Sequence, residues 1–380
     1  MKKICFVATI PAAVNSFLRD HIQAAGETYS VTVVCNSEDK YLLEGLDAKI
    51  IFLPIERKPS PLMDLLVLIQ LVKLFRQEKF DIVHSHLPKT GLLGMLAAWL
   101  TCVPIRINTF HGEVWATQSG LRRIALKLCD QLVGLFATNI LVVSPSQQAF
   151  LVKEGILPQG KSKLIDAGSI CGVNPLRFHT DSDVRFTIRK DLEVAQEATV
   201  ILFVGRLNRD KGMLDLASAF DAISKHHSNV VLLLVGTEED VVFSQIQEIC
   251  NDELDRLHYV SFTDTPEHYM AAADIFCLPS YREGLPMTIL ESAACGVPTV
   301  ASRIYGITDA VEEGKTGLLF TAGDVSGLTQ LLSILIEDKY LRQQMGEAAR
   351  LRVLDLFLSD KITEGVLAFY AKLLTERYGC

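Results

Sequence analysis

Short, almost continuous apolar runs alternate with longer segments of helical periodicity through the first half of the chain. Apolar runs that lack polar residues at every second position are typical of strands buried on both faces of a parallel sheet. Segments in which apolar residues recur every three or four positions predict helices between those strands. We expect strands over residues 3–9, 29–35, 49–53, 80–85, 104–110 and 139–144, and helices over 15–25, 62–76, 91–100, 120–136 and 145–154.

A turn-rich stretch at residues 168–175 interrupts this alternation and is interpreted as a linker. The pattern predicts an α/β protein with two tandem, doubly wound Rossmann-like domains, 1–170 and 171–358, and a terminal helix within 359–380. Ligands of such sheets bind at the carboxyl ends of the strands, so we expect the site in a cleft where the two domains face each other. In the second half, strands are expected over 199–205, 230–236, 258–262, 274–278, 298–301 and 317–320, and the last helices over 326–336, 338–354 and 360–378.

Composition and charge narrow the class of protein. A chain of 380 residues, 49% of them hydrophobic, is too long for one core and agrees with two globular domains. The formal net charge of −8 argues against a protein that binds nucleic acid. Residues 1–175 hold 18 Lys and Arg against 14 Asp and Glu, whereas the remainder holds 19 against 31. The first half could therefore face an anionic surface or substrate, although ordinary scatter of surface charge explains the same count.

Cysteine usage and hydropathy indicate the compartment. The nine cysteines form no C-x-x-C pair, so we expect buried thiols in a reducing cytoplasm rather than disulfides or a zinc site. The N-terminal run is interpreted as the first strand, and the longest charge-free stretch, 90–105, is too short to span a membrane. The apolar helices over 62–75 and 91–100 are either buried helices with a charged edge or a face that meets anionic lipid at the inner face of the cell membrane. The cations close to them are Lys58, Lys73, Arg76, Lys79 and Lys89.

Candidate chemistry is densest at residues 280–291. An apolar strand is followed there by a polar turn and then by Pro286, which a helix start tolerates. Because a helix N-terminus offers unpaired N–H groups and a positive dipole, this segment suits a phosphate. Glu283 lies in the turn and Glu291 about two helical turns later, at a spacing that returns it to nearly the same face. Two ordinary surface acids would give the same spacing.

A second candidate anion site follows the strand at 199–205. Arg206 and Lys211 follow the carboxyl end of this strand. The guanidinium of an arginine can bond two phosphate oxygens at once and the ammonium of a lysine acts as a point charge, so the two residues together would suit a diphosphate. Solvated loop charges are the alternative interpretation. Neither G-x-G-x-x-G after the first strand nor a P-loop motif is present, which disfavours dinucleotide oxidoreductases and P-loop enzymes.

Three histidines end strands in the first domain: His84, His86 and His111. His111 could touch a substrate or donate a proton near neutral pH, but a lone histidine is more often structural. The three lack the regular spacing of a metal site, so no metal is expected. Residues 10–15 are interpreted as a loop after the first strand, and they carry no glycine run for close approach to a phosphate.

Arg206, Lys211-Gly212 and the run from Tyr281 to Pro286 that leads to Glu291 resemble the C-terminal domain of retaining glycosyltransferases of family 4, which have the GT-B fold. Residues 272–274, 294–298 and 314–319 fit the same domain, and 81–86 and 110–112 resemble the family's acceptor-binding domain. Within the family, the chain is most similar to bacterial transferases for capsule, O-antigen, lipopolysaccharide and other lipid-linked oligosaccharides. The family often has Gly-Gly after the first strand, where this chain has Pro11-Ala12-Ala13, so phosphate contact from that loop is in doubt.

This resemblance implies a role for each candidate residue. Arg206 and Lys211 bind the donor diphosphate, Glu291 the ribose hydroxyls and Glu283 the donor sugar, which it positions near the reacting carbon. His111 reaches that sugar from the acceptor-binding domain, and the final helix crosses back to that domain. Cations stabilise the leaving group, so neither a metal nor a cofactor is needed. The backbone that cradles sugar and phosphate belongs to Gly284, Leu285, Met287 and Thr288.

The resemblance implies transfer of an N-acetylhexosamine or related sugar from a nucleotide-sugar, with retention of configuration. It also implies that the nucleotide is UDP. The acceptor is lipid-linked or a polysaccharide in bacterial surface glycan synthesis, and peripheral membrane contact through the first domain is an expectation. A non-catalytic, nucleotide-sugar-binding scaffold of a glycan-assembly complex is one alternative. A sugar-nucleotide epimerase of the same fold is another, and it would isomerise the donor without any acceptor.

Overall fold

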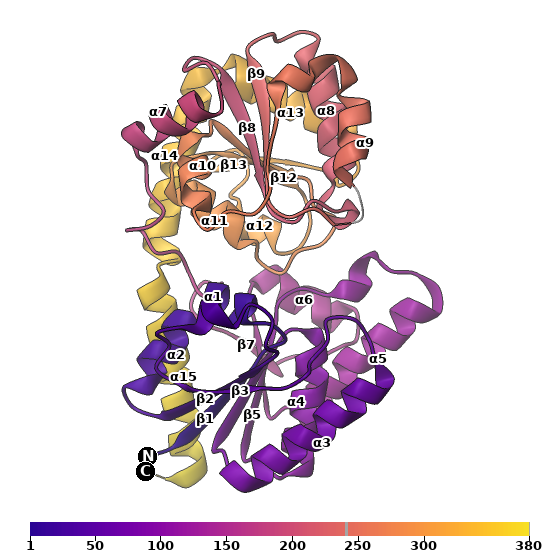
Figure 1. Ribbon diagram of the computed structural model, residues 1–380, viewed down its shortest axis with the longest axis vertical. Helices are drawn as coiled ribbons and strands as arrows, with labels where there is room; N and C mark the ends of the chain where they lie inside the picture. The colour runs from indigo at the N-terminus through magenta and orange to yellow at the C-terminus, as the bar shows by residue number, and fades with distance from the viewer. Residues whose placement is uncertain (240–241, 380) are drawn as a thin grey trace. The chain divides into compact units, whose positions relative to one another are not determined.

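The computed structural model describes residues 1–239 and 242–379 and divides the chain into two compact units. The first unit comprises Met1–Gly172 together with Ser359–Cys380, and the second comprises Val173–Leu358 (Figure 1). Within the described residues, no helix combines the length and the hydrophobicity that a membrane span requires.

The first unit is built on a parallel sheet of seven strands in the order β3-β2-β1-β4-β5-β6-β7. The order reverses between β1 and β4, and this is the position at which parallel sheets open a crevice at their carboxyl edge. The strands are β1 (Lys3–Val7), β2 (Ser30–Cys35), β3 (Lys49–Phe52), β4 (Ile82–His86), β5 (Ile105–Phe110), β6 (Asn139–Val142) and β7 (Ser162–Leu164).

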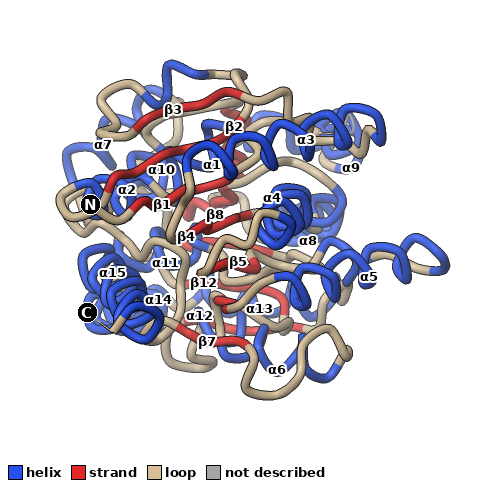
Figure 2. Tube along the Cα trace, turned by 90° about the horizontal axis from the view of Figure 1, so that it is seen from below, coloured by secondary structure: helices blue, strands red, loops and turns tan. Residues whose placement is uncertain are grey.

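Helices cover both faces of this sheet, and each face has its own apolar core (Figure 2). One core joins the sheet to α3 (Pro61–Glu78), α4 (Pro88–Leu100) and α5 (Gly120–Phe136). The other joins it to α2 (Arg19–Gly26) and to the last helix, α15 (Ser359–Tyr378). The remaining helices are α1 (Pro11–Phe17) and α6 (Pro145–Lys153), with 3-10 turns η1 (Lys40–Leu43) and η2 (Val114–Thr117).

The second unit repeats the plan with six parallel strands in the order β10-β9-β8-β11-β12-β13, reversing between β8 and β11. All six residues of its central strand are buried, because helices cover both of its faces. The strands are β8 (Thr199–Val204), β9 (Val230–Val235), β10 (Leu257–Val260), β11 (Ile275–Leu278), β12 (Thr299–Ser302) and β13 (Gly317–Phe320). The helices are α7 (Ser182–Asp191), α8 (Met213–Ser224), α9 (Val242–Ile249), α10 (Pro266–Ala272), α11 (Met287–Ala294), α12 (Ile307–Ala310), α13 (Val325–Glu337) and α14 (Lys339–Leu356), with 3-10 turns η3 (Arg209–Lys211) and η4 (Asn251–Arg256). The predicted fold class, two Rossmann-like domains, is confirmed.

Two local expectations are wrong. Residues 10–15 are not a loop, because α1 begins at Pro11, whose fixed φ suits a first helical position, and the following alanines favour a helix. Helix α7 lies between residues 175 and 199, where the sequence pattern predicted no helix. Its Arg189 is buried and bonds the carboxylate of Asp274 and the carbonyl oxygens of Ala198 and Ala272, so tertiary contacts stabilise a helix that has little apolar periodicity.

Candidate active site

The loops after β8 and β11 lie side by side because these two strands pair at the point where the strand order of the second sheet reverses. The loop after β8 carries Arg206 and Lys211, and the loop after β11 carries Glu283. Lys211 Nζ lies 2.5 Å from Glu283 Oε1. The predicted phosphate-binding lysine and the predicted sugar-binding acid are therefore neighbours, and each is mostly buried.

Further bonds join the same two segments. The hydroxyl of Tyr281 donates to Asp215 at the start of α8 over 2.7 Å. Arg282 Nε donates to Asp210 Oδ2 over 2.8 Å, and the backbone N–H of Tyr281 donates to the carbonyl oxygen of Asp210 over 2.8 Å. Together with the Lys211–Glu283 pair, these bonds hold the two loops in one arrangement, which pre-organises the charges for a ligand.

Glycines let the backbones of these loops approach each other closely. Gly212 caps α8 with a φ of 70°, and a Cβ placed on it would lie 2.1 Å from the carbonyl oxygen of Pro279. Gly306, before α12, has a φ of 81°, and a Cβ there would lie 2.1 Å from the carbonyl oxygen of Gly284. Only glycine fits both the left-handed conformation and the contact, so these positions fix the loops in space.

Arg206 bonds an acid that the sequence analysis did not select. Its NH1 donates to both carboxylate oxygens of Glu239 over 3.0 Å, and Asn208 Nδ2 donates to the same carboxylate over 3.0 Å. Glu239 follows β9, the strand next to β8, so the strand order would have placed it at this edge. Arg206 uses one of its two terminal nitrogens for Glu239, and its side chain is half-exposed, which leaves donors for an anion.

Helix α11 begins at Met287 with Pro286 as its N-cap, and within the described part of the chain the side chain of that N-cap residue accepts no hydrogen bond from the helix start. Leu285 and Met287 turn their side chains into the core, so their backbone is the part that could contact a ligand, whereas Thr288 is partly exposed. Glu283 precedes the helix, so helical periodicity does not relate it to Glu291, and the spacing argument for that pair is wrong.

Glu291 lies inside α11 in a partly buried position. The pKa of its carboxyl is raised to about 7, mainly by burial; the charge of Arg177 opposes this shift and the smaller effect of Glu267 adds to it. A carboxyl whose pKa is strongly raised by burial is a candidate functional group. Its predicted contact with ribose hydroxyls stays a prediction.

Three histidines of the first unit, His84, His86 and His111, lie together at the carboxyl ends of β4 and β5. His86 Nδ1 lies 3.1 Å from His111 Nε2, and the rings of His84 and His86 lie 4.1 Å apart. His84 bonds the hydroxyls of Tyr370 over 2.6 Å and Thr109 over 2.7 Å. Burial lowers the pKa of His111 to about 3 and holds those of His84 and His86 well below the usual value. All three are neutral near pH 7, so proton donation by His111 is disfavoured, whereas hydrogen bonding to a sugar stays a prediction.

A cavity of about 10 Å³, the size of one water molecule, lies beside His111. Asp130 of α5 reaches it and accepts a hydrogen bond from Trp115 Nε1 over 2.7 Å. Burial raises the pKa of Asp130 to about 6. Leu87, which also lines the cavity, has a φ of 71°, a strained backbone for a residue with a side chain. The sequence analysis missed Asp130 because it is an ordinary polar position of an amphipathic helix.

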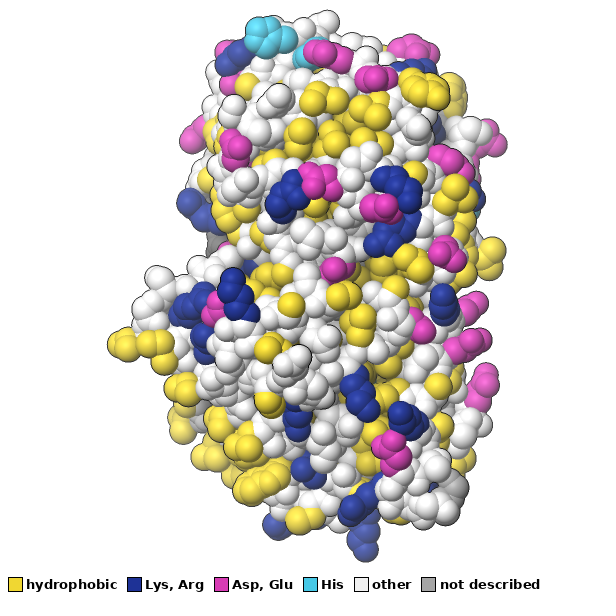
Figure 3. Space-filling view, turned by 180° about the vertical axis from the view of Figure 1, so that it is seen from behind, with side chains coloured by type: hydrophobic (Ala, Val, Ile, Leu, Met, Phe, Trp, Pro, Cys, Tyr) yellow, Lys and Arg dark blue, Asp and Glu magenta, His cyan; other side chains and the backbone are white. Residues whose placement is uncertain are grey.

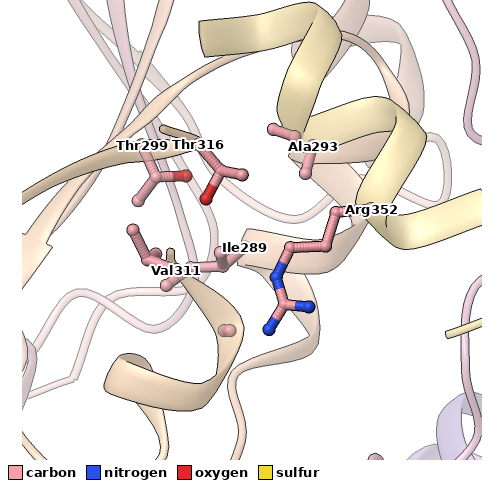
Figure 4. Close-up of a pocket in the computed structure, with 8 residues that line it drawn as sticks. Ile289, Ala293, Thr299, Val311, Thr316 and Arg352 are labelled. Atoms are coloured by element: carbon pink, nitrogen blue, oxygen red, sulfur yellow. The ribbon is translucent and has the colours of Figure 1, made fainter. Parts of the chain in front are cut away.

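A second small hollow is lined by residues of α11, α14 and the segments around β12 and β13, and it lies within the packed interior of the second unit. Figure 4 shows the side chain of Arg352 entering it toward Ile289 and Val311, with the hydroxyls of Thr299 and Thr316 nearby. The side chains leave no room for a water molecule. In the described part of the chain, no group of three or more His, Cys, Asp or Glu is arranged to hold a metal ion.

Comparisons with known proteins identify the family. Residues 184–352 match the family model described as glycosyl transferases group 1, and residues 14–168 match that of glycosyltransferase family 4. The chain belongs to these glycosyltransferases.

This glycosyltransferase is similar along its whole length to characterised relatives. The capsular polysaccharide biosynthesis glycosyltransferase CapM of Staphylococcus aureus is 27% identical over 100% of this chain and 99% of its own. The UDP-Gal:alpha-D-GlcNAc-diphosphoundecaprenol alpha-1,3-galactosyltransferase of Escherichia coli is 27% identical over 92% of this chain and 91% of its own. The HepE protein of Anabaena, solved in complex with UDP-glucose, has the same GT-B fold with a TM-score of 0.83 and 20% identity, over 98% of this chain and 100% of that one.

In a glycosyltransferase, charge develops on the leaving group as the bond to the sugar breaks. The paired loops of the second unit place two cations, an uncapped helix start and a carboxylate at one sheet edge. Cations and helix N–H groups stabilise a developing negative charge, and a carboxylate accepts hydrogen bonds from sugar hydroxyls. The arrangement therefore has the groups that such a reaction needs.

Proposed function

We propose that this glycosyltransferase moves a sugar from a UDP-sugar to a lipid-linked or polysaccharide acceptor in bacterial surface glycan synthesis, with retention of configuration. The sugar we propose is an N-acetylhexosamine or a related hexose. One observation supports the proposed donor site above all: Lys211 Nζ lies 2.5 Å from Glu283 Oε1. This pair lies at the carboxyl edge of the second sheet, which Arg206 also reaches.

The proposed mechanism is electrostatic. When a diphosphate enters, Lys211 and the free donors of Arg206 turn to its oxygens, and the N-terminus of α11 faces the same charge. Release of Lys211 frees Glu283 to accept a hydrogen bond from a hydroxyl of the donor sugar and to position the reacting carbon. Each stabilising donor contributes a few kcal/mol to the transition state. Two cations take the place that a divalent ion holds in other enzymes, so we propose that the reaction needs no metal.

The relatives support this choice of substrates. The E. coli relative is named for a UDP-sugar donor and an acceptor linked to diphosphoundecaprenol, and the S. aureus relative is named for capsular polysaccharide. HepE, which shares the fold, is titled as a complex with UDP-glucose. Retention rests on the resemblance of residues 281–291 to the retaining family and is tested by the anomeric configuration of the product.

Glu283→Gln tests the assignment of the acid. The substitution keeps the shape of the side chain and removes its charge, so transfer should fall about 100-fold or more, with UDP binding retained. The measurement combines turnover of a radiolabelled UDP-sugar with a lipid-linked acceptor and UDP titration by calorimetry. Glu312→Gln is the matched control, because it breaks an exposed Lys–Glu pair, Lys315–Glu312, elsewhere in the same unit. Near-normal transfer in the Glu283 variant would remove its proposed role, and donor isomerisation without acceptor would favour an epimerase.

A further inference from the structure

Two histidines of the first unit form a pair at the carboxyl edge of its sheet. His86 is the last residue of β4, His111 follows β5, and these two strands are neighbours. His86 Nδ1 lies 3.1 Å from His111 Nε2, and the two rings are nearly perpendicular, at 81°. We call these two residues the histidine pair. Since burial keeps both rings neutral near pH 7, each ring carries one hydrogen, so one nitrogen of this contact donates and the other accepts.

His86 is the enclosed member of the histidine pair. Its side chain is 3% exposed, and its Nε2 is buried without a hydrogen-bond partner among the residues that the structure describes. The ring of His84 lies 4.1 Å away, but both of its nitrogens are already bonded, to Tyr370 and to Thr109. The ring of Phe6 is nearly parallel to that of His86, at 15°, so an N–H in the plane of the imidazole does not point at its face. A hydrogen on Nε2 of His86 would therefore find no acceptor in the described part of the chain.

This unpartnered nitrogen indicates the direction of the hydrogen bond. A buried backbone N–H without an acceptor is rarer in proteins than a buried carbonyl without a donor, and we extend that rule to the ring. The interior therefore favours hydrogen on Nδ1 of His86 rather than on Nε2. Nδ1 of His86 then donates to Nε2 of His111, and the single hydrogen of the neutral His111 ring must lie on its Nδ1.

His111 is the member of the pair that a ligand could reach. It is partly exposed, and within residues 1–239 and 242–379 no hydrogen bond is recorded for its Nδ1. Phe17 of α1 contacts its ring edge-to-face, with the ring centres 6.1 Å apart, so protein contacts fix the ring from two sides. In Figure 3 the histidine side chains that reach the surface belong to the second unit, which agrees with a buried position for His86.

We propose that His86 is a positioning residue of the transfer reaction. Its Nδ1–H fixes His111 as the tautomer whose own Nδ1–H is directed away from His86 and donates to a sugar hydroxyl. A neutral ring can make this hydrogen bond without giving up a proton. Without His86, the hydrogen of His111 could lie on either nitrogen, and only one of the two tautomers would offer the donor. The inference rests on the proposed function, because it names a sugar hydroxyl as the ligand of His111.

Nitrogen NMR of the full chain with isotope-labelled histidine tests the direction of the bond, because it distinguishes protonated from unprotonated ring nitrogens. The signals of His111 are those lost in His111→Gln. The unchanged protein should carry hydrogen on Nδ1 of His111 and none on Nε2. In His86→Leu the two tautomers of His111 should be mixed. Hydrogen on Nε2 of His111 in the unchanged protein, or the same tautomer in both proteins, would overturn the proposal.

Rates of sugar transfer test the positioning role. His86→Leu removes the donor, so kcat should fall about tenfold or more, whereas UDP affinity should be unchanged. His86→Asn carries an amide N–H on Cγ, the carbon that bears Nδ1 in histidine, so kcat should stay within about threefold of the unchanged protein. Circular dichroism and tryptophan fluorescence check that both variants fold. Unchanged kcat in the folded leucine variant, or equal losses in both variants, would overturn the positioning role.

Ser85→Ala is the matched control. It removes another buried hydrogen bond of β4, from Ser85 Oγ to Asn108 Oδ1 over 2.9 Å, and should leave both kcat and the tautomer of His111 unchanged. A loss of kcat in this control equal to that of His86→Leu would assign the effect to general damage of the strand and overturn the proposal. An unchanged protein that transfers no sugar would overturn the proposed function and the sugar as ligand, whereas the NMR result would still decide the bond within the histidine pair.

Discussion

The charged residues of the candidate site in the second unit differ in whether another side chain neutralises them. Lys211 and Glu283 satisfy each other, and Arg206 bonds Glu239, so the charges are paired before any diphosphate arrives. Glu291 differs, because burial raises its pKa to about 7 and, among the residues that the structure describes, it takes part in no ion pair, although the charge of Arg177 partly opposes the shift. A group that destabilises the fold unless a ligand bonds it is expected at a functional position.

Glu291→Gln should therefore stabilise the protein at alkaline pH. When folding raises the pKa of a carboxyl, the free energy of unfolding falls as the pH rises from the pKa of the unfolded state, 4.5, to the pKa of the folded state, about 7. The neutral glutamine avoids this loss, so the gain should approach about 3 kcal/mol at pH 8 and vanish at pH 4. Urea unfolding at pH 8 and at pH 4 measures this gain in the free energy of unfolding. Glu347→Gln, which changes an exposed acid of α14, is the control. An equal gain at both pH values would contradict the interpretation, and UDP affinity should fall in the variant.

At the scale of elements, the site is a junction of two loops. The loop after β8 and the loop after β11 are joined by side-chain bonds and by a close backbone contact at Gly212. Because Arg206, Lys211 and Glu283 all belong to these loops, the junction sets their relative positions. A change that separates the loops should affect ligand binding even if it removes no charged group.

Gly212→Ala should separate them. Its Cβ would meet the carbonyl oxygen of Pro279 at 2.1 Å, in addition to the strain of a φ of 70°. We expect destabilisation of about 2 kcal/mol or more and at least tenfold weaker UDP binding. Gly314→Ala is the control, because Gly314 has a φ of 76° and no atom within 4 Å of the added Cβ. That control should cost about 1 kcal/mol and leave UDP affinity unchanged. Calorimetric titration and urea unfolding of both variants measure the difference.

At the scale of the molecule, the two ends of the chain belong to the same unit. Helix α15 contributes Val366, Phe369 and Tyr370 to the core beside α2, and Tyr370 bonds His84. Thr363 of the same helix bonds His21 over 2.9 Å. The last helix therefore supports the strand that carries the histidine cluster.

Phe369→Ala should destabilise the first unit. Phe369 is buried in that core, and replacement of a buried phenylalanine by alanine costs about 3–5 kcal/mol. Chemical unfolding followed by tryptophan fluorescence measures it, because both tryptophans, Trp99 and Trp115, lie in this unit. UDP binding by the second unit should be unchanged. Lys372→Ala, at an exposed position of α15, is the control and should change stability by less than about 0.5 kcal/mol. A loss of the same size in both variants would contradict the account.

The sequence by itself determined the sheets and the location of the candidate site. Continuous apolar runs bury both faces of a strand, so the pattern predicted two parallel, doubly wound domains, and the family and the fold are confirmed. Arg206, Lys211 and Glu283 follow two strands, and parallel strands bring their carboxyl ends to one edge. Their roles toward a donor stay predictions.

Tertiary structure alone decided the partners. Glu239 and Asp130 have no local signature, because a hydrogen bond to Arg206 or Trp115 depends on which strands and helices become neighbours. Helix α7 forms because Arg189 is bonded in the interior. The neutral state of His111 and the raised pKa of Glu291 follow from burial, a property of the packed chain. Periodicity records which faces are apolar, whereas contacts between distant residues arise only when those faces pack.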